Sequence, residues 1–152
     1  WFSCNLGARC SINEPELSLA SLKPIPAPNP DTAPYWAALR EHRLTIQKCT
    51  NCGKLRHYPR PMCDACYCME HVWSDASGHG TVYSWTETHH AFNPGFKAEV
   101  PYVLVTVDLI EGVRLNVQLR DASAHVLEIG QAVIVGFEAL SPELTVPVVR
   151  LA

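Results

Sequence analysis

The sequence predicts a mainly β protein, in which an N-terminal helix and a rubredoxin-like zinc ribbon are followed by a five-stranded OB-fold barrel. Two CxxC pairs in the first half and a series of strand patterns in the second half point to this fold class. Hydrophobic residues make up 47% of the 152 residues, which supplies a core and excludes disorder over the whole length. No apolar run approaches the ~18 residues of a membrane helix, so no integral membrane protein is expected.

The first segment, residues 1–30, is predicted to be extended or disordered. It has no hydrophobic periodicity, and four prolines alternate with other residues near its end. Such a stretch is extended in solution or lies along another surface. The opening residues carry neither a basic segment nor the long apolar segment of a secretory signal, so we expect a cytoplasmic protein.

Residues 31–45 are predicted to form a short helix and the start of a strand. Asp31 is the expected N-cap, and Pro34 is tolerated in the first turn. One helix face would carry Tyr35, Trp36, Leu39 and Arg43. This face either packs on its own domain or docks a partner. The alternating residues 44–47 are typical of a strand.

The zinc ribbon is predicted over residues 46–71. Two CxxC pairs, ten residues apart, are formed by Cys49, Cys52, Cys63 and Cys66. Each turn places two thiolates on one side of a metal, and the two turns together complete a tetrahedron at Zn–S distances of ~2.3 Å. Zinc is the expected metal, and iron of the rubredoxin type is the less favoured alternative. Four thiolates leave no open position, so the metal is structural.

Three further cysteines, Cys4, Cys10 and Cys68, stand outside this spacing. A secreted disulfide scaffold is disfavoured because the count of seven is odd and no signal peptide is evident. Cys68 could replace Cys66 as a ligand, but its offset breaks the CxxC turn, which favours a free thiol.

The OB-fold domain is predicted over residues 72–152. Period-two patterns mark five strands at 81–88, 102–109, 113–119, 132–138 and 144–151, with Gly78 and Gly80 preceding the first. The second and third form a hairpin. The longest connection without a strand lies between the third and the fourth, as in a small closed barrel of the OB type.

Charge is unevenly distributed along the chain. Residues 40–60 carry six basic residues against Glu41, whereas residues 61–152 carry four basic residues against eleven acidic ones. A nucleic-acid binder presents positive charge on its working face. The acidic barrel therefore argues against nucleic acid as a partner.

The order of motifs resembles a known family. The segments that carry the resemblance are Asp31-x-x-Pro34-Tyr35-Trp36-x-x-Leu39, Leu44-x-Ile46-Gln47-x-Cys49-x-x-Cys52-Gly53, Tyr58-Pro59-Arg60-x-x-Cys63-x-x-Cys66, Ser77-Gly78-x-Gly80-Thr81-Val82-Tyr83-Ser84-Trp85, Pro101-Tyr102, Glu111-Gly112-Val113-Arg114-Leu115 and Ile129-Gly130. Over residues 30–152 the chain is similar to the small proteins that join a rubredoxin-like zinc ribbon to an OB-fold, long catalogued as a domain of unknown function.

The resemblance implies a role in acyl-CoA metabolism. Family members are accessory subunits of thiolase-like enzymes: thiolases, acyltransferases and the aldolases of steroid side-chain degradation. The implied role is a non-catalytic subunit that scaffolds a thiolase-fold enzyme and contributes to acyl-CoA binding, and a hydratase is a further expected partner. Of the family's functional residues, only the four cysteines carry over, as metal ligands.

Candidate contacts for acyl-CoA or the partner enzyme fall into two groups and a single residue. The basic residues Lys54, Arg56 and Arg60 could meet phosphates or an acidic surface, or could balance the charge of the metal thiolates. The loop residues Phe92, Phe96 and Lys97 could contact a partner or cover the barrel mouth. Trp36, on the predicted helix, is a further candidate contact.

Two other functions stay open at this point. OB domains stack single-stranded nucleic acid on aromatic strands, and Tyr83 and Trp85 alternate on one strand. A rubredoxin-like electron carrier would require iron. For catalysis, the three cysteines outside the CxxC pairs lack a glycine-rich nucleophile turn, and Glu87 and Glu99 are distant in sequence, so no enzyme is expected.

Overall fold

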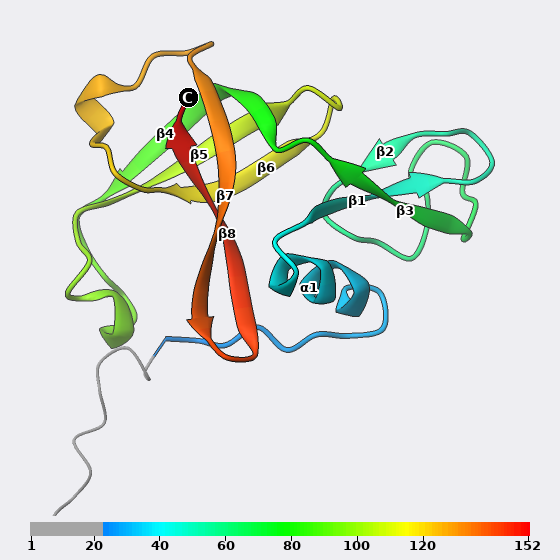
Figure 1. The fold of residues 1–152 in the computed structure, drawn as a ribbon, viewed down its shortest axis with the longest axis horizontal. Coiled ribbons are helices and arrows are strands. Elements are labelled where there is room, and N and C mark those ends of the chain that lie inside the picture. Colours follow the sequence, from blue (N-terminus) through cyan, green and yellow to red (C-terminus); the bar gives the residue numbers. More distant parts are fainter. Residues whose placement is uncertain (1–22) are drawn as a thin grey trace, which may run out of the picture.

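A small three-stranded sheet and a closed five-stranded barrel make up the protein, with one helix beside them (Figure 1). The computed structural model describes residues 23–152. Most of the predicted N-terminal segment, including Cys4 and Cys10, lies outside the described residues. The mainly β architecture with a helix, a ribbon and a five-stranded barrel confirms the predicted fold class.

Helix α1 spans Ala33–Arg40 and packs against strand β1 of the small sheet and strand β8 of the barrel. Its N-cap is Thr32, not Asp31 as predicted. The reason is a turn in which the Asn29 side chain accepts a hydrogen bond from the Thr32 backbone N–H at 2.9 Å. Leu39 is fully buried and Tyr35 is 5% exposed. The helix face therefore packs on its own domain.

The small sheet has the order β2-β1-β3, with all pairs antiparallel. Strand β1 spans Leu44–Cys49, β2 is the short pair Leu55–Arg56, and β3 spans His71–Ala76. The sequence pattern does not reveal β3, because its residues are only partly buried and show no clean alternation. Pairing with all six residues of β1 defines it.

The barrel strands are β4 (His79–Thr88), β5 (Tyr102–Leu109), β6 (Arg114–Leu119), β7 (Ala132–Ser141) and β8 (Leu144–Leu151). Their order is β4-β5-β6-β8-β7, and pairing of β7 with β4 closes the barrel. The 3₁₀ turn η2 (Pro94–Phe96) lies between β4 and β5, and η3 (Ala124–Val126) lies in the long connection between β6 and β7.

Strand β4 starts two residues earlier than predicted, at His79, so Gly80 lies inside it. A Cβ atom at Gly80 would come within 2.6 Å of the Asp108 carbonyl oxygen on β5. Glycine is therefore needed here for the close approach of two strands.

The barrel interior is filled mainly by β-branched side chains. Val105, Val107 and Val149 are fully buried, and Val82 and Leu115 are 1% exposed. These residues belong to one hydrophobic cluster that extends through Leu44 and Ile46 of β1 to Tyr35 and Leu39 of α1. The ribbon and the barrel therefore share part of their core. Among residues 23–152, no helix combines the length and the apolar character needed to cross a bilayer.

Candidate metal centre and adjoining basic cleft

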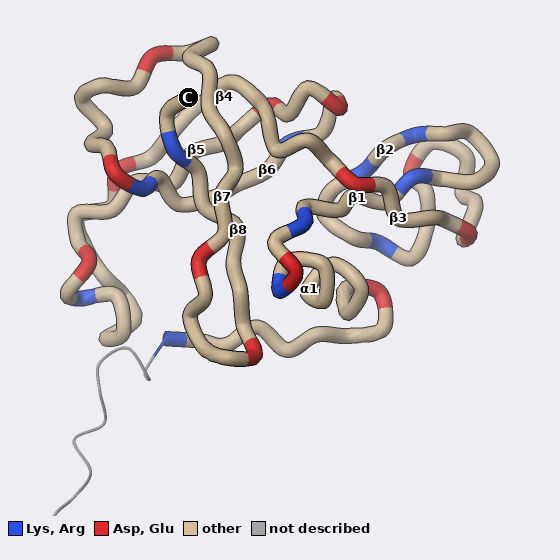
Figure 2. The backbone as a smooth tube through the Cα atoms, viewed as in Figure 1, with Lys and Arg blue, Asp and Glu red and all other residues tan. Residues whose placement is uncertain are grey.

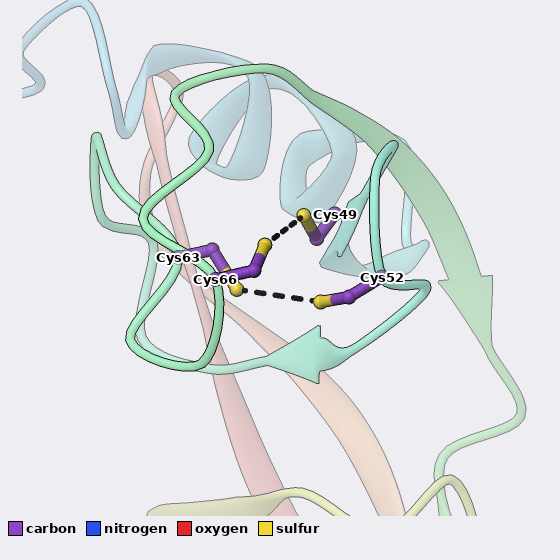
Figure 3. Close-up of side chains that lie close together, drawn as sticks. All are labelled: Cys49, Cys52, Cys63 and Cys66. Atoms are coloured by element: carbon purple, nitrogen blue, oxygen red, sulfur yellow. Dashed lines mark hydrogen bonds between the residues drawn. The ribbon is translucent and has the colours of Figure 1, made fainter.

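Four cysteine side chains converge at one end of the small sheet (Figure 3). Cys49 ends β1, Cys52 lies in the turn before β2, and Cys63 and Cys66 lie in the loop between β2 and β3. Their sulfur atoms all lie within 4.8 Å of one another. The distance is 3.5 Å between the sulfurs of Cys49 and Cys66, and 3.6 Å between those of Cys52 and Cys63.

This geometry fits a tetrathiolate metal site. Sulfur ligands at ~2.3 Å from zinc form a tetrahedron with edges of about 3.8 Å, close to the separations in the cluster. Each CxxC segment forms a similar turn: the Gly53 backbone N–H donates to the Cys49 carbonyl at 3.0 Å, and that of Tyr67 donates to the Cys63 carbonyl at 2.9 Å. Gly53 adopts φ 71°, which glycine reaches without strain.

Backbone N–H groups around the cluster favour thiolates. The pKa of Cys49 is lowered first by the backbone N–H of Cys52, and the pKa of Cys63 is lowered first by that of Ala65. The pKa of Cys52 is raised to about 12: the backbone N–H of Lys54 lowers it, but the Cys66 sulfur, burial and the other cysteines outweigh that effect. Four crowded thiolates thus require a cation, and this donor set suits zinc or another thiophilic metal.

Cys68 lies beside the cluster and makes different contacts. Its sulfur atom is 3.9 Å from the Thr50 hydroxyl and 3.7 Å from the Glu70 carbonyl oxygen. The residue is half-buried.

Next to the metal cluster, a cleft of about 210 Å³ separates the ribbon from the turn between β5 and β6. The predicted basic residues Lys54, Arg56 and Arg60 all line it, together with Asp64 and His57. Lys54 donates to the Asp64 carboxylate at 2.7 Å. Figure 2 shows Lys and Arg segments along the ribbon near β1 and β2. The fold therefore brings the three predicted basic residues into one place.

Arg56 differs from the other two because its side chain is buried, at 6% exposure. Its Nε donates to Gln47 Oε1 at 2.7 Å and its Nη2 to the Arg60 carbonyl at 3.1 Å. Nη1 is buried without a hydrogen-bond partner among the described residues. Arg56 thus forms part of the cleft's inner wall.

Gln47 is a structural residue of this site that the sequence pattern does not predict. It is fully buried, and its Oε1 accepts from Arg56 and from the Arg60 backbone N–H, the latter at 2.9 Å. A buried glutamine in the middle of an alternating strand has no local sequence signal. Its hydrogen bonds with Arg56 and with the Arg60 backbone, which only the tertiary structure brings to it, identify its role.

The other predicted contact residues lie elsewhere. Phe92 is 94% exposed, Lys97 is exposed, and Phe96 packs near the Tyr102 ring, all in the segment around η2. Figure 1 places that segment on the opposite side of the barrel from the ribbon. Trp36 is half-buried on α1 and contacts the Tyr35 ring edge-on. These residues do not join the basic cleft.

Comparison with protein families identifies both parts of the chain. Residues 36–75 match the model "ChsH2, rubredoxin-like zinc ribbon domain", and residues 73–138 match "ChsH2, C-terminal OB-fold domain". The boundary between the two models falls at β3, immediately before the barrel begins.

Curated relatives fall into two groups. A probable enoyl-CoA hydratase alpha subunit of Thermomonospora curvata is 41% identical over 87% of this chain and 41% of its own length. The 3-oxo-4,17-pregnadiene-20-carboxyl-CoA hydratase alpha subunit of Mycobacterium tuberculosis is 36% identical over 71% of this chain and 34% of its own length. The chain thus spans about two fifths or less of these two relatives. A DUF35 domain-containing scaffold protein of Pyrococcus furiosus is 36% identical over 65% of this chain and 72% of its own length.

Among solved structures, a chain of the Ltp2-ChsH2(DUF35) aldolase is 39% identical and superposes with a TM-score of 0.76 over 84% of this chain and 98% of its own. A DUF35 protein of unknown function from Sulfolobus solfataricus is 16% identical, with a TM-score of 0.57, and shows the shared fold. These matches, together with the zinc-ribbon and OB-fold models, show that the chain belongs to the DUF35 family in its ChsH2-like form.

Proposed function

We propose that this chain is a non-catalytic accessory subunit that binds and scaffolds a thiolase-like enzyme. The observation that carries the proposal is its similarity, along nearly the full length of the matched chain, to ChsH2(DUF35) of the Ltp2-ChsH2 aldolase. Relatives named as scaffold proteins and as hydratase alpha subunits support the same role. A thiolase-fold enzyme of acyl-CoA metabolism is the proposed partner, and a hydratase is the proposed second partner.

The metal centre supports a structural contribution to this role. Four converging cysteines fill all the positions of a tetrahedral metal, which leaves none for substrate. We propose zinc as that metal, with Cys49, Cys52, Cys63 and Cys66 as ligands. When bound, the metal would cross-link the two CxxC turns, and the hydrogen-bonded residues around it hold these turns in place.

Acyl-CoA contact is proposed for the residues named from the sequence. Lys54, Arg56 and Arg60 line one cleft, whereas Trp36 and the η2 residues are not among its lining residues. The two groups could therefore contact different parts of an assembly. The cytoplasmic location and the boundaries of the domains stay predictions.

Affinity capture of the tagged full chain from its native lysate tests the proposal. We expect a stoichiometric thiolase-fold enzyme, and we expect the recombinant pair to turn over an acyl-CoA substrate that the isolated chain leaves unchanged. Turnover by the isolated chain would refute the non-catalytic role. Capture without any acyl-CoA enzyme would refute the scaffold role.

The nucleic-acid alternative is disfavoured by a contact on β4. The guanidinium of Arg114 lies 3.4 Å from the centre of the Tyr83 ring, so one face of this ring is already covered. The same arginine donates to Asp108 at 2.6 Å, which neutralises its charge. Metal analysis addresses the electron-carrier alternative, because a colourless zinc protein has no one-electron couple.

A further inference from the structure

The cleft between the ribbon and the barrel concentrates positive charge around a small concave space. Three cationic side chains line it, and Asp64 is the one carboxylate among its lining residues. Its other wall is the turn at Gly112 and Val113, neither of which carries a charge. Within residues 23–152, neither Arg56 nor Arg60 forms an ion pair with a carboxylate, whereas Lys54 pairs with Asp64.

The cations of the cleft differ in accessibility. The Lys54 side chain is 44% exposed and Arg60 is exposed, so both can reach a ligand at the rim. Arg56 lies in the wall, where Gln47 and the Arg60 carbonyl fix its guanidinium. Because Nη1 is covered by neighbouring atoms, Arg56 acts on the cleft through its electric field. A buried charge acts more strongly than an exposed one since water screens it less.

The existing Lys54–Asp64 pair shows that the rim already holds an oxyanion. A carboxylate oxygen sits 2.7 Å from Lys54 Nζ. After Asp64 is counted, the lining residues retain two positive charges, which matches a doubly charged anion better than a single carboxylate. A planar arginine guanidinium and a compact lysine ammonium that lie close together are donors suited to binding phosphate.

We propose that this cleft binds the phosphate group of a small-molecule ligand, with Lys54 and Arg60 as direct contacts and Arg56 as the buried supporting charge. The inference deepens the proposed acyl-CoA contact, and it rests on the proposed function only for the identity of the molecule that carries the phosphate. The bound metal thiolates carry negative charge beside the cleft, so binding is weak and salt-dependent when phosphate is offered alone.

The test is a titration of the metal-loaded full chain with inorganic phosphate at pH 8 and low ionic strength, followed by amide NMR shifts. We expect saturating shifts at residues 54–60 and 112–113. Sodium chloride at matched ionic strength should not reproduce them. Sodium acetate offers a planar monoanion, and we expect it to bind at least about fivefold more weakly than phosphate.

Variants make the test specific. Lys54→Gln and Arg60→Gln should each weaken phosphate binding about fivefold, whereas Arg40→Gln, which removes one positive charge from an exposed position outside the cleft, should leave it unchanged. Asp64→Asn removes the competing carboxylate and should strengthen binding severalfold. Metal content is measured for every variant, so that loss of the ribbon is distinguished from loss of the contact.

Three results would overturn the inference: shifts that do not saturate, acetate binding as tight as phosphate, or wild-type affinity in both Lys54→Gln and Arg60→Gln. The lysate capture described above is independent of this titration. Phosphate binding without an acyl-CoA enzyme would leave the inference standing and the proposed function refuted. Capture of an acyl-CoA enzyme without phosphate binding would support the proposed function and refute the inference.

Discussion

Replacing Cys63 with serine is the most direct test of how the ribbon is held together. Cys63 is fully buried, and its sulfur lies 3.6 Å from that of Cys52. Its backbone also anchors the second knuckle, because its carbonyl accepts from the Tyr67 N–H and its own N–H donates to the Cys68 carbonyl. A serine hydroxyl preserves the size of this side chain approximately but removes one thiolate ligand.

The expected magnitude follows from the number of ligands. Structural zinc contributes on the order of 12 kcal/mol to folding of a small metal domain, or roughly 3 kcal/mol for each of four ligands. Loss of one ligand should therefore weaken metal binding about 100-fold. Strand β2 pairs with β1 through two residue pairs only, so the cysteine-bearing turns on either side of β2 should open without metal. The barrel should persist because its strands close on themselves.

The assay combines metal analysis after treatment with a competing chelator and hydrogen exchange of individual amides. In Cys63→Ser we expect loss of metal and loss of protection at the Gly53 and Tyr67 amides, with protection retained at Val105 in the barrel. Cys68→Ser is the matched control, since Cys68 lies outside the four-sulfur cluster, and it should keep both metal and protection. Wild-type metal content in Cys63→Ser would show that the ligand assignment is wrong.

Three further substitutions test the packing of the core, the close approach of two strands and the pH dependence of stability. Leu39→Ala should lower the free energy of unfolding by about 2–5 kcal/mol because it opens a cavity in the shared core, while the exposed neighbour Arg40→Ala should change the urea midpoint little. Gly80→Ala should cost about 1–3 kcal/mol by thermal denaturation, because the new Cβ meets the Asp108 carbonyl; unchanged stability would contradict the close approach. Burial lowers the pKa of His57 from 6.5 to about 4, so the unfolded chain binds more protons between these values and stability falls as pH drops through that window. The loss is on the order of 3 kcal/mol at most, and His57→Gln should flatten that part of the urea stability–pH profile relative to the wild type.

Much of the candidate site could be predicted from the sequence because its signal is local. The CxxC spacing fixes two cysteines within each turn, and the structure brings both turns to one point. Strand and turn patterns similarly predicted the five barrel strands, since their valines alternate and glycines mark the turns. Both signals depend only on residues that lie close together in the sequence.

Other features depend on contacts between distant segments. Asp31 has the right residue type for an N-cap, but the Asn29 turn moves the cap to Thr32. Strand β3 forms because β1 offers it an edge. Arg56 looks like a surface cation in sequence, yet Gln47 and the Arg60 carbonyl bury it.

The sequence by itself determined the five barrel strands and the cysteine set, because periodicity and motif spacing act over a few residues. Tertiary structure alone decided that the ribbon and the barrel share a core, and that basic side chains of the ribbon face the turn between β5 and β6 across one cleft. The physical reason is that burial and charge proximity depend on where the closed barrel places its turns. No local pattern in the ribbon encodes that position.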